Sequence, residues 1–316
     1  MKHRLDLRCS RRVVLTAAVS MSASLPACSS NGGQAESALA ASSTTPVPVS
    51  TAPATTVPVE YEQTPFDAAN FSDSTTIDNE FFPLVPGTQV VFEGDANRGA
   101  GQLTHRVIIT VTDLTKVIDG VRTVVVWERD INEGTQVETE LSFFAQDDDG
   151  NVWNLGEYPE EYESRVFVGA PSTWIAGQPG AEGGIHVHGE PRLESPIYLE
   201  GRVPAIEFLD VALVAAMDAQ VCIPLDCYDG VLVVDEWDPL AQPEDGHQLK
   251  NYAPGVGVVR VDPVGGDEQE SLTLTDRREL SADEMEEVRA EALRLDERAY
   301  QYAPSVYGET PPAEAP

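Results

Sequence analysis

Lysine is nearly absent from this chain of 316 residues, which contains only Lys2, Lys116 and Lys250. Lysine and arginine together number 20, against 53 aspartate and glutamate residues, so the formal net charge is −33 at pH 7. Such an excess of carboxylates repels a phosphate backbone, which excludes general nucleic-acid binding. The scarcity of lysine also leaves no polybasic patch for docking on anionic lipid.

The signatures of common enzyme classes are missing as well. The chain contains no Gly-x-Ser-x-Gly nucleophile elbow, no phosphate-binding Walker loop, no dinucleotide fingerprint and no His-Glu-x-x-His motif. Adjacent carboxylates such as Asp235 and Glu236 do occur, but neighbouring residues of a strand face opposite ways and make a poor acid–base pair. We therefore predict that the protein is not an enzyme, and we assign no catalytic residue and no cofactor.

Long hydrophobic runs are also lacking, and the longest candidate lies at the N-terminus. Five basic residues precede an apolar run over 13–25, which is too short for a stable membrane-spanning helix and is typical of an export signal. Directly before this run, Arg11 and Arg12 resemble a twin-arginine signal, although the general secretory route remains an alternative. Leu25-Pro26-Ala27-Cys28 resembles a lipobox, in which Cys28 is acylated. We predict a signal peptide over 1–27 and a lipoprotein on the outer face of the cell membrane, or a secreted protein if Cys28 is not lipidated.

Three further segments follow the predicted signal peptide. Residues 28–64 are rich in Ser, Thr, Ala and Pro and bury too little apolar area to fold, so we predict a disordered tether. Residues 65–303 form a single β-rich domain. Residues 304–316 are predicted to be a disordered tail. Because residues 1–27 hold five basic residues and one acidic one, the exported part is even more acidic than the whole chain.

The β-rich prediction depends on alternation between apolar and polar residues. Residues 103–111 and 135–145 alternate in this way, and turn sequences such as Asp119-Gly120 separate the runs. Further strands are expected over 207–221, 228–237, 257–262 and 270–277, with loops over 169–189 and 238–246. No helical period separates successive strands, which argues against a βαβ architecture. We expect a mainly β fold, in which an antiparallel meander forms a curved sheet or a partly open barrel.

One helix is predicted at the C-terminal end of the domain, over 281–302. Ser281 and Glu284 form a capping box, and apolar residues then recur at spacings of three and four up to Pro304. The helix is expected to pack on the sheet or to close one mouth of the barrel.

Three motifs together resemble a known group of proteins. These are Phe82-Pro83-Leu84-Val85-Pro86-Gly87-Thr88, the segment 145–153 (AQDDDGNVW) and Tyr252-Ala253-Pro254-Gly255-Val256-Gly257. In this order they resemble a family of uncharacterised exported proteins and lipoproteins common in actinobacteria and related bacteria. The resemblance covers most of residues 65–305 and implies a β-rich exported domain with no established activity.

Two cysteines remain once Cys9 leaves with the signal and Cys28 is acylated. Cys222 and Cys227 flank a short turn containing proline between two expected strands. Because exported proteins encounter an oxidising environment, we predict a disulfide between them.

Histidines supply the sharpest candidate for a site. If residues 185–190 are extended, His186, His188 and Glu190 point to the same side and suit Zn²⁺ or Cu²⁺. A solvated loop with two histidines is the alternative interpretation. His105 lies on the apolar face of its strand, so we interpret it as a core or rim histidine.

The sequence leaves the specific activity open. The first hypothesis is a non-enzymatic, membrane-anchored binding or interaction module, with a lipid or another cell-envelope ligand. The second is a metal-binding protein or metal-dependent enzyme that uses His186 and His188. The third is a structural protein of the cell envelope.

Overall fold

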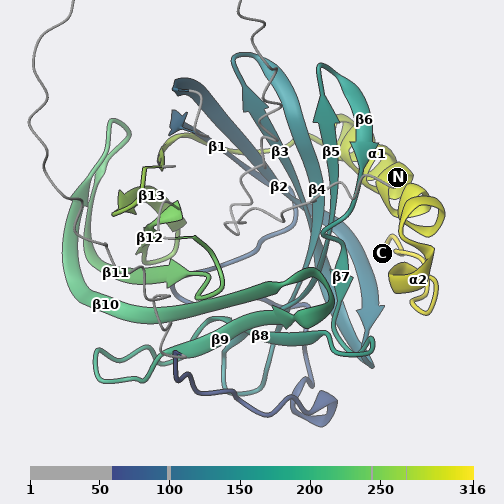
Figure 1. Ribbon diagram of the computed structural model, residues 1–316, viewed down its shortest axis with the longest axis horizontal. Coiled ribbons are helices and arrows are strands. Elements are labelled where there is room, and N and C mark those ends of the chain that lie inside the picture. Colours follow the sequence, from purple (N-terminus) through teal and green to yellow (C-terminus); the bar gives the residue numbers. More distant parts are fainter. Residues whose placement is uncertain (1–58, 98–100, 243–244, 268) are drawn as a thin grey trace, which may run out of the picture.

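The computed structural model describes residues 59–97, 101–242, 245–267 and 269–316. The predicted signal peptide, Cys28 and most of the predicted tether lie outside these residues. The described chain is mainly antiparallel β structure with helices at its C-terminal end (Figure 1). The strands are β1 Thr88–Asn97, β2 Gln102–Ile118, β3 Val121–Asn132, β4 Thr135–Gln146, β5 Val152–Glu163, β6 Val166–Gly169, β7 Trp174–Ile175, β8 Glu182–Val187, β9 Tyr198–Val203, β10 Phe208–Cys222, β11 Cys227–Trp237, β12 His247–Ala253, β13 Gly257–Val264 and β14 Glu270–Glu279. The helices are η1 Ala68–Asn70, η2 Pro204–Ile206, α1 Ala282–Tyr302 and α2 Pro304–Tyr307.

Twelve strands close into a barrel. Neighbouring strands pair in the order β4-β3-β2-β1-β14-β13-β12-β11-β10-β9-β8-β5, and β5 pairs with β4 to complete the ring. The closing seam runs from Glu138 opposite Glu161 to Gln146 opposite Val152. The predicted mainly β, antiparallel fold is therefore confirmed. The sheet is not partly open, because β4 and β5 satisfy each other's backbone groups along most of their length.

Strand alternation separates the interior of the barrel from its outer wall. On β4, Glu138, Glu140 and Ser142 face the interior, whereas Thr139 and Leu141 face outward beneath α1. Nearly the whole strand is buried, because one of its faces lines the barrel and the other lies under a helix. The same arrangement on β3 explains why both of its faces are rich in buried residues.

Helix α1 begins at the predicted capping box. The Ser281 hydroxyl accepts from the Glu284 amide, and the Glu284 carboxylate accepts from the Ser281 amide. Its buried stripe contains Val288, Ala292, Leu295 and Ala299 and packs on the outer wall of the barrel over β2 and β4 (Figure 1). The helix therefore covers the wall and does not close a mouth. Among the described residues, no helix is long and apolar enough to cross a membrane.

The C-terminal tail corrects a second prediction. Residues 304–316 were expected to be disordered, but Tyr307 is fully buried and donates to Asp296 of α1. Glu314 pairs with Thr115 of β2 through two main-chain hydrogen bonds. The tail is ordered because its few apolar side chains fill the space between α1 and the barrel wall.

The predicted boundaries shift at two other places. The end of the predicted tether is ordered, because the main chain of Glu62 pairs with β9 next to Tyr198. The loop expected over 169–189 contains β7 and β8, which its glycines concealed. Gly184 shows why glycine is needed there, since a Cβ would lie 2.2 Å from the Leu199 carbonyl oxygen on β9.

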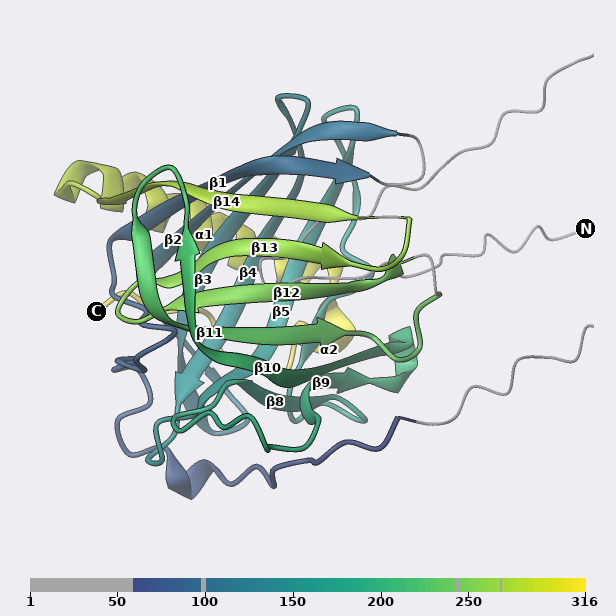
Figure 2. The same cartoon turned by 90° about the vertical axis from the view of Figure 1, so that its left-hand side faces the viewer.

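The segment that precedes β1 covers one end of the barrel. Gly87 donates its amide to the Val111 carbonyl on β2, and the Glu80 carbonyl accepts from Gly255 in the β12–β13 turn. Asn79 donates to the carbonyls of Gly150 and His188, which follow β4 and β8. Figure 2 shows this segment running along the same end of the strands. These contacts place Phe82 at the floor of the interior.

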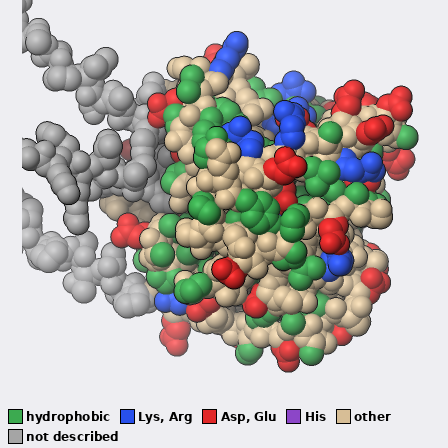
Figure 3. Space-filling model, turned by 90° about the vertical axis from the view of Figure 1, so that its right-hand side faces the viewer, with side chains coloured by type: hydrophobic (Ala, Val, Ile, Leu, Met, Phe, Trp, Pro, Cys, Tyr) green, Lys and Arg blue, Asp and Glu red, His purple; other side chains and the backbone are tan. Residues whose placement is uncertain are grey.

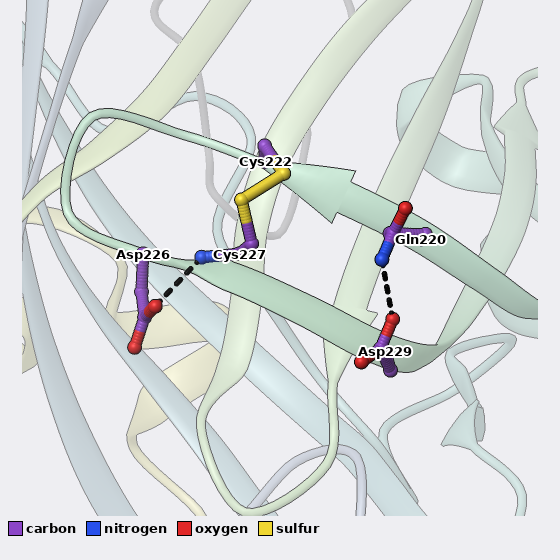
Figure 4. Close-up of a disulfide and its surroundings, with 5 residues drawn as sticks. All are labelled: Gln220, Cys222, Asp226, Cys227 and Asp229. Carbon is purple, nitrogen blue, oxygen red and sulfur yellow. Dashed lines mark hydrogen bonds between the residues drawn. A yellow bond between two sulfur atoms is a disulfide. The ribbon is translucent and has the colours of Figure 1, made fainter.

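The predicted disulfide is confirmed. Cys222 ends β10 and Cys227 begins β11, and their sulfur atoms are bonded at the tip of this hairpin (Figure 4). Gln220 donates to Asp229 across the same two strands. The bridge therefore fastens the end of a long, exposed hairpin.

Candidate functional site

Five polar side chains meet inside the barrel, above the floor formed by Phe82. His186 comes from β8, Glu200 from β9, Glu236 from β11, and Lys250 and Tyr252 from β12. His186, Lys250 and Tyr252 are fully buried, while Glu200 is 4% and Glu236 8% exposed. We call these residues the interior cluster. Their strands bring them together because every second residue faces inward, and because β11 and β12 pair with Val234 opposite Lys250.

The cluster is connected by short polar contacts. The Nδ1 atom of His186 lies 3.4 Å from a carboxylate oxygen of Glu200. The Lys250 ammonium forms an ion pair with Glu236. The Tyr252 hydroxyl donates to Glu236 at 3.2 Å and lies 3.5 Å from the Nε2 atom of His186.

Aromatic rings separate the cluster from a small cavity. The Phe82 ring lies edge-on to His186 at a centroid distance of 4.6 Å, and Phe144 lies at 5.5 Å from it. Below them is a cavity of about 60 Å³, lined chiefly by apolar residues of β1–β4 together with Glu128 and Ser142. This cavity suits a few atoms, because sites for drug-sized ligands measure roughly 300–1,000 Å³.

Burial sets the protonation of the cluster. Burial, together with the nearby Lys250 charge, lowers the pKa of His186 to about 3. Burial also raises the pKa of Glu200 to about 7, and burial together with Glu200 raises the pKa of Glu236 to about 7. Burial alone would lower the pKa of Lys250, but Glu236 and Glu200 outweigh it, so this pKa is raised. At neutral pH the cluster therefore presents a neutral imidazole, a charged ammonium and two carboxyl groups near their titration midpoint.

The predicted His-x-His-x-Glu set does not converge. His186 points into the barrel, whereas His188 is half-buried beyond the end of β8 and packs on the Tyr198 ring at 4.4 Å. Glu190 is 80% exposed and pairs with Arg192. The prediction assumed an extended chain through residue 190, but β8 ends at Val187. Of the three residues, only His186 belongs to the interior cluster.

Sequence reasoning missed four members of the cluster. Glu200, Glu236, Lys250 and Tyr252 are far from His186 in sequence, and strand pairing alone brings them close. Two signals pointed to them. Lys250 is one of only three lysines, and Tyr252 begins the Tyr-Ala-Pro-Gly-Val-Gly motif.

A second histidine lies elsewhere in the interior. His105 of β2 is 2% exposed, and its Nε2 atom lies 3.2 Å from Glu270 of β14. Its Nδ1 atom lies 3.3 Å from Asp130 and 2.7 Å from the Asn132 side chain. Burial alone would lower the pKa of His105, but the two carboxylates outweigh it and raise this pKa to about 9. The prediction of a core histidine is confirmed. Because His105 contacts the carboxylates of Asp130 and Glu270, we interpret these contacts as structural ion pairs.

A larger depression lies outside the barrel, between α1 and the wall. It measures about 380 Å³ and is lined by residues of β3–β5 and α1, among them Trp127, Glu160, Tyr162, Arg294 and Arg298. Arg298 pairs with the buried Glu160 at 2.6 Å. Figure 3 shows the helix-bearing face, where acidic and basic side chains are interspersed. The charged lining of this depression does not suit an apolar ligand held between the sheet and α1.

Comparisons with known proteins leave the function open. No family model and no curated protein matches the chain. A protein from Bacteroides fragilis NCTC 9343, described as exported and with a YmcC-like fold, is 13% identical, with a TM-score of 0.38. A protein from Parabacteroides distasonis ATCC 8503, described as a lipoprotein, is 14% identical, with a TM-score of 0.30. Each match covers 63% of this chain and 99% of the other.

Proposed function

We propose that the chain is an exported lipoprotein whose barrel binds a small polar or ionic ligand without catalysing a reaction. The interior cluster is the observation that carries this proposal. Burying several ionisable side chains in one place lowers stability unless they hold one another or a ligand. Here they gather beside a cavity that has room for only a few atoms.

The anchoring part of the proposal depends on the N-terminal sequence. The basic stretch, the apolar run over 13–25 and Cys28 favour export followed by acylation. A tether of some thirty residues would then hold the barrel away from the membrane surface. The membrane is thus a partner through the lipid anchor.

A binding role is favoured over an enzymatic one by the surroundings of His186. Its polar neighbours are Glu200 and Tyr252, whereas a nucleophilic mechanism pairs histidine with Ser, Cys or Thr. The small volume of the cavity also disfavours a lipid chain as the ligand.

The ligand is tested by mass spectrometry of the protein isolated from a bacterial envelope. Masses under native and denaturing conditions are compared, and we expect an excess mass in the native form. Glu200→Gln should abolish the excess, whereas Glu190→Gln, at an exposed residue outside the cluster, should retain it. The absence of any excess in the wild-type protein would contradict the proposed binding role and leave a structural role in the envelope.

The anchor is tested separately by cell fractionation. The wild-type protein should sediment with membranes, and Cys28→Ser should move it to the soluble exported fraction. If the Cys28→Ser protein still sediments with membranes, lipidation at Cys28 is wrong.

A further inference from the structure

The geometry points to a divalent transition-metal site formed by His186, Glu200 and Glu236, in which the metal displaces Lys250 from Glu236. One imidazole nitrogen and two carboxylate oxygens suit Zn²⁺ or Mn²⁺. This inference rests on the proposed binding function and names its ligand.

The distances between donor atoms fit such an ion. One ligand atom from each of the three residues lies within 4.8 Å of the others. Zinc binds nitrogen and oxygen at about 2.0–2.2 Å, so its tetrahedral ligands stand roughly 3.3 Å apart. His186 and Glu200 already have this separation, at 3.4 Å. Glu236 lies within the same group of ligand atoms and is paired with Lys250, so an ion bound there would replace the Lys250 ammonium as its partner.

Two buried atoms that can coordinate a metal support the site independently of the distances. The Nδ1 atom of His186 and one carboxylate oxygen of Glu200 have no hydrogen-bond partner among the described residues. Both side chains are almost completely excluded from solvent. A buried acceptor without a hydrogen bond is costly, and a metal ion facing both atoms removes that cost.

Lys250 indicates that the site accommodates a cation. Its ammonium is fully buried and lies against Glu236. A divalent ion supplies more positive charge at the same place and adds coordinate bonds to His186 and Glu200. Calcium is disfavoured, because it requires six to eight oxygen ligands and does not favour imidazole.

The test is a competition titration of Zn²⁺ against a chromophoric chelator, using the purified exported chain. We expect one saturable site, and His186→Ala and Glu200→Gln should each weaken it by roughly tenfold or more. The matched controls His188→Ala and Glu190→Gln should leave the affinity unchanged. Circular dichroism verifies that each variant is folded. Absence of Zn²⁺ binding in the folded wild-type protein, or equal losses in His186→Ala and His188→Ala, would overturn the site.

A second measurement compares the melting temperature of Lys250→Met with and without Zn²⁺. It remains informative even if this variant is less stable than the wild type. Without metal, this variant should melt at a lower temperature than the wild type, because two buried carboxyl groups lose their cation. With Zn²⁺ it should recover, and it should bind the ion more tightly than the wild type. A variant whose melting temperature does not respond to Zn²⁺ would overturn the displacement of Lys250.

The results also separate this inference from the proposed function. If the isolated protein carries an excess mass but binds no Zn²⁺, the metal site is wrong and the binding function stands. If it neither carries a mass nor binds Zn²⁺, both are wrong.

Discussion

Both lysines of the described chain are fully buried and pair with carboxylates. Lys250 pairs with Glu236 inside the barrel, and Lys116 pairs with Asp296 between the barrel wall and α1. Neither side chain is exposed to solvent. A buried ammonium group requires a partner of opposite charge, and each of these two lysines has one. The surface carries its positive charge on arginine instead.

Replacing Lys116 tests how much the outer ion pair contributes. Its ammonium donates to Asp296 and Tyr300 at 3.0 Å each and to the Pro311 carbonyl at 2.6 Å. Lys116→Met leaves the buried Asp296 without its cationic partner, so we expect a loss of about 3–5 kcal/mol in the free energy of unfolding. Adding Asp296→Asn should recover part of this loss, as measured by urea denaturation. A double variant as unstable as the sum of the single variants would show that the two residues are not coupled.

His105 predicts a dependence of stability on pH. Its pKa is raised to about 9 in the folded state, above the ordinary value of 6.5, so protonation favours folding. The stabilisation is complete below pH 6.5, declines as pH rises and is lost above about pH 9. Its size is at most on the order of 3 kcal/mol. His105→Gln should flatten the curve of unfolding free energy between pH 6 and 10, whereas His247→Gln at a partly exposed position serves as the control. An unchanged slope in His105→Gln would contradict this assignment.

At the scale of elements, the sequence predicted best where the signals are local. The capping box and the three-and-four spacing placed α1 almost to the residue. Strands with one exposed face, such as the end of β10, also matched. By contrast, β8 and β9 were missed, because the interior accepts carboxylates and glycines where a simple core requires apolar residues. Binary patterning cannot identify such strands, since both of their faces are buried and one of them is polar.

The C-terminal tail is a short element whose order depends on tertiary contacts. Tyr307 packs against Phe143 and Tyr158 of the wall, and the Ala313 amide donates to Asp296. Ending the chain at Ala303 should therefore lower the free energy of unfolding by about 2 kcal/mol or more, from the loss of the Tyr307 side chain alone. Removing only the exposed Ala315 and Pro316 should have no effect. Thermal melts of the two truncations distinguish a packed tail from a loose one.

At the scale of the whole molecule, the site could not be predicted, because it depends on closure of the barrel. His186 was named from the sequence, but its partners Glu200 and Glu236 lie on strands that the sequence does not connect to it. Asp235 and Glu236 were dismissed as a pair because they face opposite ways, and they do. Asp235 contacts His247 outside the cluster, while Glu236 reaches into it. Alternation was therefore correct locally, and the missing information was which strands become neighbours.

The last prediction concerns the closure of the barrel between β4 and β5. In an open sheet, β4 would be an edge strand, and its free amides would exchange with solvent quickly. In the closed barrel β4 lies between β3 and β5, so peptides covering Thr135–Gln146 should exchange deuterium as slowly as those covering β2. The short strand β6, whose Val166 and Val168 are 64% and 49% exposed, provides the fast-exchanging comparison. Rapid exchange along β4 with slow exchange along β2 would mean that the seam opens in solution. The interior cluster would then be reached through the seam between β4 and β5, and its metal-binding kinetics would follow the opening rate of these strands.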